Sequence, residues 1–224
     1  MGKGAQSEVR IKAGMVELEG ELALPDSPVG MVMFAHGSGS SRHSPRNRYV
    51  ARALQEGRLG TLLMDLLTPA EDQIDSRTAE LRFNIDLLAE RVIAAVDWIV
   101  SQSSLQKLNV GLFGASTGAA AALVAAARST VKVSAVVSRG GRPDLAGTAL
   151  PQVRAATLLI VGGSDLTVLE LNREALEELR GEKELKIISG ATHLFEEPGA
   201  LDEVSRLAKE WFQRHLGREN TNAA

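Results

Sequence analysis

Hydrophobic residues are distributed along the chain in two patterns, short continuous runs and longer stretches with helical spacing. The run 30–35 is apolar throughout, as expected of a strand that is buried on both faces. In the stretch 79–100, apolar residues recur every three or four positions, which is the spacing of one helix face. These residues are Leu81, Ile85, Leu88, Val92, Ala95, Val96 and Ile99. The two patterns together predict buried strands packed against amphipathic helices.

The same patterns predict the remaining elements. The expected strands are 8–11, 15–24, 30–35, 61–65, 110–113, 131–138, 157–161 and 185–188. The expected helices are 48–56, 79–100, 117–128, 170–179 and 201–215. A short helix near Asp144 is left open, and the segment 66–78, with Pro69 and several acidic residues, is expected to be a loop.

The order of these elements predicts the fold class. Two paired strands come first, and then strand and helix alternate five times, which predicts an α/β fold with a doubly wound, mainly parallel sheet. We expect helices on both faces of the sheet and an antiparallel strand pair at the N-terminus. The gaps between elements are too short for a cap domain. One domain therefore spans 1–224, with its core at about 8–216 and a polar tail at 217–224.

Charge and composition narrow the classes of partner and cofactor. The net charge of −3 argues against nucleic acid or an anionic membrane as the main partner. The absence of cysteine excludes disulfides, thiolate zinc sites and cysteine nucleophiles. Segment 1–6 lacks the apolar core of a secretion signal, and no apolar run approaches membrane-spanning length. We therefore expect a cytoplasmic protein without a metal or another cofactor.

The most informative motif is the pentapeptide Gly114-Ala115-Ser116-Thr117-Gly118. It follows the expected strand 110–113 and opens the expected helix 117–128. A G-x-S-x-G sequence between a strand and a helix is typical of a nucleophilic serine held on a sharp turn. The alternative is a glycine-rich turn that only lets a helix pack closely on a sheet.

Asp165 and His193 follow two later strands, in the chain order serine, aspartate, histidine. Ligands of parallel sheets bind at the carboxyl ends of the strands, so these side chains are expected at one edge. A serine hydroxyl becomes a good nucleophile when an imidazole accepts its proton, and a carboxylate holds that imidazole in one tautomer. The alternatives are a helix-capping or turn aspartate for Asp165 and an ordinary loop histidine for His193.

A serine nucleophile also needs N–H groups that stabilise an oxyanion. We expect one from Thr117, at the start of its helix, and one from Ser38, in the glycine-rich loop 36–41. The alternative for this loop is a turn that cradles phosphate, but it lacks the spacing of the known phosphate-binding motifs.

Several arginines lie near the same strand ends and are candidates for binding a substrate carboxylate. Structural ion pairs, for example to Asp65 or Asp72, are the alternative for each of them. The arginines considered are Arg42, Arg46, Arg48, Arg139 and Arg142. The residues chosen as candidate substrate contacts are Arg42, Arg142, Leu66 and Leu194.

With these segments the chain resembles the α/β-hydrolases, and among them the compact, capless dienelactone-hydrolase-like group. The resembling segments are 36–47, 114–118, 138–145, 162–165 and 191–195. The resemblance implies Ser116 as nucleophile, Asp165 as acid and His193 as base, in hydrolases of small esters and lactones. The founding dienelactone hydrolases use a cysteine nucleophile, so the resemblance does not extend to the dienelactone substrate.

The sequence therefore predicts a serine hydrolase that cleaves small esters or lactones through an acyl-enzyme, as a monomer or homodimer. Its pocket should be shallow and walled in part by 66–74, 142–149 and 194–195. Two other functions stay open. The first is a hydrolase-fold ligand-binding or interaction module with incidental esterase activity. The second is a nucleotide-binding doubly wound protein, which would need a glycine fingerprint that 36–41 does not provide.

Overall fold

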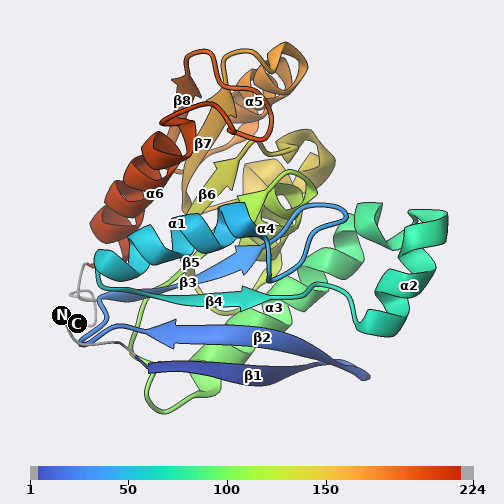
Figure 1. The fold of residues 1–224 in the computed structure, drawn as a ribbon, viewed down its shortest axis with the longest axis vertical. Coiled ribbons are helices and arrows are strands. Elements are labelled where there is room, and N and C mark those ends of the chain that lie inside the picture. Colours follow the sequence, from blue (N-terminus) through green and yellow to red (C-terminus); the bar gives the residue numbers. More distant parts are fainter. Residues whose placement is uncertain (1–4, 218–224) are drawn as a thin grey trace.

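The fold is seen in a computed structural model, which describes residues 5–217 (Figure 1). Most of the expected polar tail at 217–224 and of the N-terminal segment 1–6 lies outside these residues. The described chain forms one eight-stranded sheet in the order β1-β2-β4-β3-β5-β6-β7-β8. Its strands are β1 (Ala5–Ala13), β2 (Val16–Leu24), β3 (Gly30–Ala35), β4 (Leu59–Met64), β5 (Val110–Ala115), β6 (Val133–Arg139), β7 (Ala156–Gly162) and β8 (Lys183–Ile188).

Strand pairing agrees with the expected sheet. β1 and β2 form an antiparallel pair, and β2 is antiparallel to β4. From β4 to β8 all neighbours are parallel, so β3 and the strands after it end at the same edge. The loops that leave this edge carry Ser38, Ser116, Asp165 and His193.

Helices cover both faces, as the alternation of elements predicts (Figure 1). α1 and α6 pack on each other and on one face, whereas α3 and α4 pack together on the other. The helices are α1 (Pro45–Glu56), α2 (Pro69–Thr78), α3 (Ile85–Ser101), α4 (Thr117–Arg128), α5 (Leu166–Glu178) and α6 (Ala200–Leu216), with 3₁₀ turns η1 (Leu81–Phe83) and η2 (Pro143–Gln152). Among residues 5–217, no helix combines the length and the apolarity that crossing a bilayer requires.

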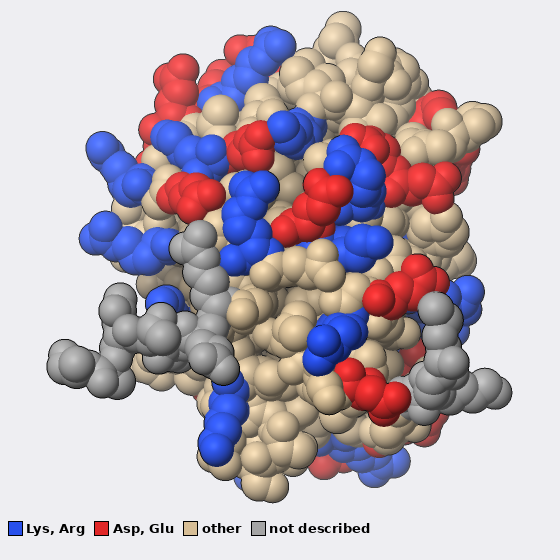
Figure 2. Space-filling view, turned by 90° about the vertical axis from the view of Figure 1, so that its left-hand side faces the viewer, with Lys and Arg blue, Asp and Glu red and all other residues tan. Residues whose placement is uncertain are grey.

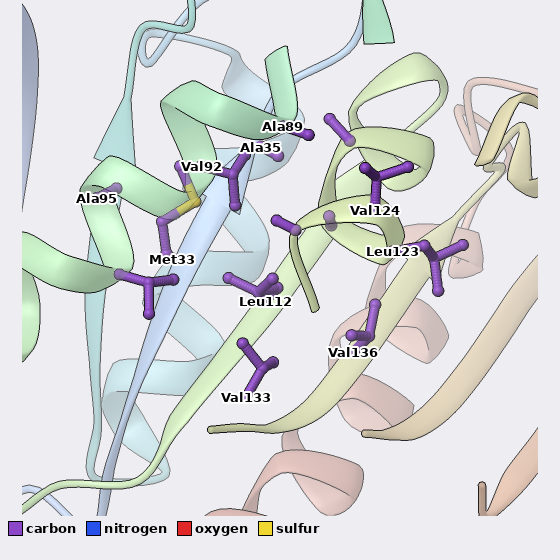
Figure 3. Packing of buried hydrophobic residues seen from close by; sticks show 14 of the residues in the cluster. Met33, Ala35, Ala89, Val92, Ala95, Leu112, Leu123, Val124, Val133 and Val136 are labelled. Carbon is purple, nitrogen blue, oxygen red and sulfur yellow. The ribbon is translucent and has the colours of Figure 1, made fainter. Parts of the chain in front are cut away.

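The core between the sheet and α3 and α4 is built by small and branched side chains. Met33 and Leu112 from the central strands lie in one buried cluster with Val92 of α3 and Val124 of α4 (Figure 3). All but three residues of α4 are buried, and its alanines leave room for the helix to approach the sheet closely. This packing fixes the start of α4, where Ser116 lies.

Gly118 allows the closest approach in this layer. A methyl group on Gly118 would lie 2.3 Å from the carbonyl oxygen of Ala35 and 2.4 Å from that of His36. The first turn of α4 is therefore in direct contact with the end of β3 and the start of the loop 36–41. Only glycine fits at this position without moving backbone.

The expectation of a loop at 66–78 is wrong, because Pro69–Thr78 forms α2. The Thr68 side chain accepts a hydrogen bond from the Glu71 N–H, and the Glu71 carboxylate accepts one from the Thr68 N–H. Proline at the first helical position is compatible with this start. The sequence Thr-Pro-Ala-Glu thus contained a capping signal that the acidic character of the segment obscured.

The helix expected at 79–100 begins only at Ile85. Ala79 has a left-handed backbone with φ of 58°, which ends α2, and Asn84 caps α3. The carboxylate of Asp75 accepts hydrogen bonds from the N–H groups of Leu81 and Arg82. These bonds to a side chain, rather than the backbone bonds of an α-helix, hold this turn. Leu81 therefore fits the apolar spacing of the expected helix but is not part of α3.

The face drawn in Figure 2 carries basic and acidic side chains among one another rather than in separate fields. Among the described residues seen there, basic side chains form no continuous surface of the kind that binds a nucleic acid backbone.

Gly118→Ala should destabilise the protein by about 1–3 kcal/mol, because the new methyl group must displace the backbone of β3 or α4. Urea unfolding followed by circular dichroism measures the change. Gly163→Ala is the control, since a methyl group there meets its nearest atom at 3.3 Å. Equal stability losses in the two variants would contradict the close approach.

Candidate active site

Ser116 lies in the sharp turn between β5 and α4, and its backbone is strained. Its φ of 51° and ψ of −123° lie in a region that costs a residue with a side chain about 1–3 kcal/mol. Three backbone hydrogen bonds hold it there. Its N–H donates to the Arg139 carbonyl at 3.3 Å, and its own carbonyl accepts from Ala119 at 3.0 Å and Arg142 at 3.1 Å. Strain held in this way is typical of a serine presented at the edge of a sheet.

Asp165 and His193 are hydrogen-bonded to each other. His193 Nδ1 donates to Asp165 Oδ2 at 2.7 Å. An ionised carboxylate only accepts, so this contact assigns the proton to Nδ1 and leaves Nε2 as an acceptor. Asp165 occupies the N-cap position of α5, but its side chain makes no capping bond. The carboxylate therefore orients the imidazole, as a general base requires.

Ser116 and His193 meet the same backbone segment at the end of β6. The Ser116 N–H reaches the Arg139 carbonyl, and a methyl group on Gly140 would lie 3.6 Å from His193 Cε1 and 3.2 Å from the His193 carbonyl oxygen. The positive φ of Gly140, 50°, lets the chain turn away between them. The three residues expected to act together thus share one edge of the sheet.

The two expected oxyanion residues also come together. Ser38 Oγ lies 2.9 Å from Thr117 Oγ1, although the two residues are 79 positions apart. A methyl group on Gly37 would lie 3.1 Å from Ser116 Cβ, so the loop 36–41 runs directly beside the serine. Ser38 and Thr117 thus lie close to each other beside the serine.

A cavity of about 200 Å³ opens beside Ser38 and Thr117. Its apolar walls are Leu66, Leu67, Pro69 and Leu88, and its polar walls include His36, Asp65, Asp72, Asp75 and Arg82. Of the expected walls, 66–74 contributes four residues, whereas 142–149 and 194–195 do not line this cavity. A small, partly apolar molecule fits the space.

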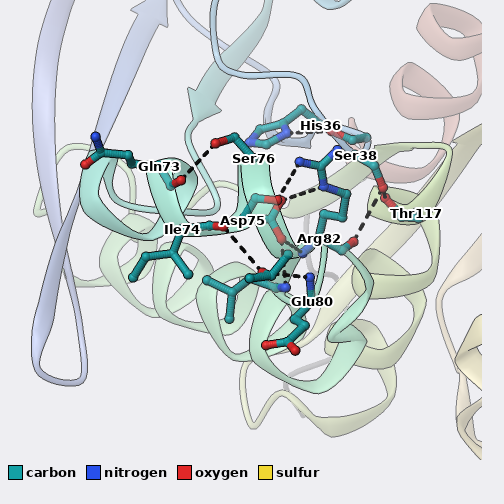
Figure 4. A network of polar contacts seen from close by, with 12 residues as sticks. His36, Ser38, Gln73, Ile74, Asp75, Ser76, Glu80, Arg82 and Thr117 are labelled. Carbon is teal, nitrogen blue, oxygen red and sulfur yellow. Dashed lines mark hydrogen bonds and ion pairs between the residues drawn. The ribbon is translucent and has the colours of Figure 1, made fainter.

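Asp75, which is buried, and Arg82, which is partly exposed, form an ion pair in the wall of this cavity (Figure 4). Arg82 Nε donates to Asp75 Oδ2 at 2.6 Å, and the Arg82 and Leu81 N–H groups donate to Oδ1. Burial alone would raise the pKa of Asp75, but these hydrogen bonds and the guanidinium outweigh it and lower the pKa. The Arg82 carbonyl in turn accepts from Ser38 Oγ at 3.5 Å. Sequence patterns did not indicate this pair, because Asp75 lies in a segment expected to be a loop and Arg82 in one expected to be a helix.

His36 connects two loops of the site. Its Nδ1 donates to the Gly37 carbonyl, and its Nε2 accepts from the Leu66 N–H, each at 3.0 Å. The ring is therefore neutral, with its proton on Nδ1. Burial lowers the pKa of His36, although the Gly37 carbonyl and nearby Asp65 oppose this effect.

The four candidate substrate contacts lie in different surroundings. Leu66 is buried and lines the cavity, whereas Leu194 is 40% exposed. Arg42 forms ion pairs with Asp65 and Glu19, and Arg142 forms a two-bond pair with Asp144 at 2.7 and 2.8 Å. Both arginines are thus already paired with carboxylates.

A family model and a similar solved structure point to the same family. A family model described as "Dienelactone hydrolase family" matches residues 25–217. The crystal structure of a dienelactone hydrolase from Anabaena variabilis is 57% identical, with a TM-score of 0.94 over 96% of this chain and all of that chain. Est1E from Butyrivibrio proteoclasticus shares the fold, with a TM-score of 0.77 at 15% identity over 93% of this chain and 98% of that chain.

A longer relative comes from Mycobacterium tuberculosis H37Rv and is named "Putative phosphoribosyl transferase Rv0571c". It is 56% identical over 209 residues, which is 93% of this chain but 46% of that protein. The chain thus spans about half the length of this relative.

His36 makes stability depend on pH. Its pKa in the folded protein is below the unfolded value of about 6.5, so its contribution is complete above that pH and is lost as the pH falls below it. His36→Gln should remove this part of the pH dependence, measured by urea unfolding between pH 8 and 5. His43→Gln, at an exposed position, is the control for the loss of one histidine. If the free energy of unfolding changes with pH in the same way in the wild type and in His36→Gln, His36 does not contribute to the pH dependence.

Proposed function

Because this chain belongs to the dienelactone hydrolase family, we propose that it is a serine hydrolase that cleaves small carboxylic esters or lactones. The main support for this proposal is the 2.7 Å hydrogen bond between His193 and Asp165, at the sheet edge where Ser116 lies. A carboxylate that fixes one imidazole nitrogen as an acceptor has a direct use in activating a hydroxyl. The strained backbone of Ser116 supports the same reading, since such strain concentrates at functional sites.

In this mechanism His193 Nε2 takes the proton of Ser116 as Oγ attacks the substrate carbonyl. The Ser38 and Thr117 N–H groups stabilise the oxyanion of the tetrahedral intermediate. The intermediate collapses to an acyl-enzyme, and His193 gives the proton to the departing alkoxide. Water, deprotonated by the same imidazole, then attacks the acyl group. The second intermediate breaks its bond to Ser116 Oγ, which takes the proton back from His193 as the acid is released. Asp165 stays ionised throughout and stabilises the imidazolium.

The size of the cavity supports a small substrate. Its volume of about 200 Å³ lies below the ~300–1,000 Å³ typical of sites for drug-sized ligands. Leu66, Leu67 and Leu88 make one side apolar, as suits a short acyl or alkyl group. Among the helices of residues 5–217 that contribute to its wall, α2 has only ten residues.

The alternative functions are less well supported. A nucleotide-binding protein would need a glycine fingerprint that 36–41 does not provide. A binding module would have no need for a strained serine beside a carboxylate-bound imidazole. Phosphoribosyl transfer is not carried over from the mycobacterial relative, because this chain matches less than half of that protein.

Ser116→Ala should lower kcat/KM for p-nitrophenyl acetate by at least about 10⁴-fold, because the other groups retain only binding and oxyanion stabilisation. Unchanged thermal unfolding would show that the loss is chemical. A fluorophosphonate should label the wild type stoichiometrically and leave Ser116→Ala unlabelled, with Ser101→Ala as a labelled control. Esterase activity that persists in Ser116→Ala would exclude this serine as nucleophile.

Leu88→Ala should shift the preferred acyl length upwards, because it enlarges the apolar end of the cavity. A p-nitrophenyl ester series from acetate to octanoate measures this, and the wild-type kcat/KM should fall for the longest acyl chains because the cavity is small. Leu105→Ala removes the same atoms from a buried position outside the cavity lining and controls for lost stability. An identical preference in both variants would show that the acyl group binds elsewhere.

A further inference from the structure

Arg139, the last residue of β6, is a buried cation without a counter-ion. It is 7% exposed and forms no ion pair with any carboxylate among residues 5–217. Its Nε has no hydrogen-bond partner, and its Nη2 makes one long contact, 3.5 Å, to Asn47 Oδ1. Burying a charge without a partner costs several kcal/mol. A protein retains such a group when something else compensates for it.

Another buried arginine shows the usual arrangement. Arg91 is also 7% exposed, and its Nε also lacks a partner. Its other nitrogens, however, reach the Ala13 carbonyl and the Glu71 carboxylate, both at 2.9 Å. Arg91 is therefore neutralised inside the protein, and Arg139 is not.

The surroundings of Arg139 add positive charge rather than remove it. Its guanidinium lies 5.8 Å from the centre of the Phe195 ring, which offers only a weak cation–π contact. Burial, and then the nearby charge of Arg46, lower the pKa of Arg139 to about 10. The group still carries its charge at neutral pH, next to a second cation.

Arg46 is the second cation, in the first turn of α1. Its Nε is also buried without a partner, and its Nη1 donates to Glu196 Oε1 at 3.1 Å. Glu196 is 65% exposed at its side chain, so it neutralises Arg46 only in part. The first turn of α1 contains no acidic residue, although the N-terminal end of a helix favours negative charge.

We propose that Arg139 and Arg46 form a binding site for an anionic group, a carboxylate or a phosphate. The anion would accept hydrogen bonds from the two guanidinium groups, whose Nε atoms have no partner, and supply the missing negative charge. The Arg46 side chain, 35% exposed, gives the anion a route from solvent. Arginine is suited to both groups, because its planar donors match their oxygens.

The position of this site relates it to the catalytic edge. The Arg139 carbonyl accepts the Ser116 N–H, and the Phe195 ring against its guanidinium lies two residues after His193. An anion here is either the charged end of an ester substrate or a free anion bound beside the site. The first source rests on the proposed function, whereas the second is independent of it.

Binding is tested with inorganic phosphate on the full chain, without any substrate. Phosphate should raise the thermal unfolding temperature of the wild type more than chloride does at equal ionic strength and pH. Arg139→Met and Arg46→Met should each weaken the phosphate affinity at least tenfold by calorimetric titration. Arg128→Met, which removes an exposed arginine at the far end of α4, should leave that affinity unchanged. Glu196→Gln should strengthen it, because it removes the competing carboxylate.

The source of the anion is tested with one neutral and one charged ester. p-Nitrophenyl acetate is neutral, and p-nitrophenyl hemisuccinate ends in a carboxylate. If the substrate supplies the anion, the ratio of kcat/KM for hemisuccinate to that for acetate should fall at least tenfold in both Arg139→Met and Arg46→Met. If the anion is free, phosphate affinity falls in these variants while the ratio stays constant.

Two results together overturn the proposal. Phosphate raises the unfolding temperature of the wild type no more than chloride does, and the kcat/KM ratio of hemisuccinate to acetate is unchanged in both variants. Phosphate binding that survives in Arg139→Met and Arg46→Met overturns it as well. The phosphate titration does not require an active enzyme. It therefore tests anion binding even if the protein does not hydrolyse esters.

Discussion

The close contact between the first turn of α4 and the end of β3 is the constraint on which the candidate site depends. Gly118 permits it, because any side chain at this position would meet the carbonyl oxygens of Ala35 and His36. The contact brings the loop 36–41 beside Ser116 and fixes the distance between Ser38 and Thr117. The strain at Ser116 persists because the surrounding layers of sheet and helix leave the turn no other conformation.

The sequence predicted the sheet, its direction and the two helical layers, because continuous apolar runs and helical spacings are local signals of burial. It also led us to expect Ser116, Asp165 and His193 at one edge, from strand order alone. The features that it missed, the turn at 79–84 and the helix α2, depend on hydrogen bonds between side chains and the backbone. Asp75 organises the turn at Leu81 and Arg82, and Thr68 with Glu71 begins α2, where polarity alone indicated a loop.

Charged groups near the site fall into two kinds that a sequence does not distinguish. Arg42, Arg82 and Arg142 are each paired with an aspartate and support the loops that they connect. Arg139 and Arg46 retain unused donors beneath the His193 loop. All of these arginines lie near polar segments, so only the positions of the carboxylates separate a structural arginine from an available one.

The way α2 is attached bears on how the cavity behaves over time. Only Asp75 of its ten residues is buried, and Ile74 on it is 57% exposed. Polar contacts through Asp75 and Glu71, rather than core packing, therefore hold this wall of the cavity. An element held in this way opens locally at a lower free energy than the whole domain unfolds. The cavity wall that α2 forms is thus more easily displaced than the buried sheet edge that carries Ser116.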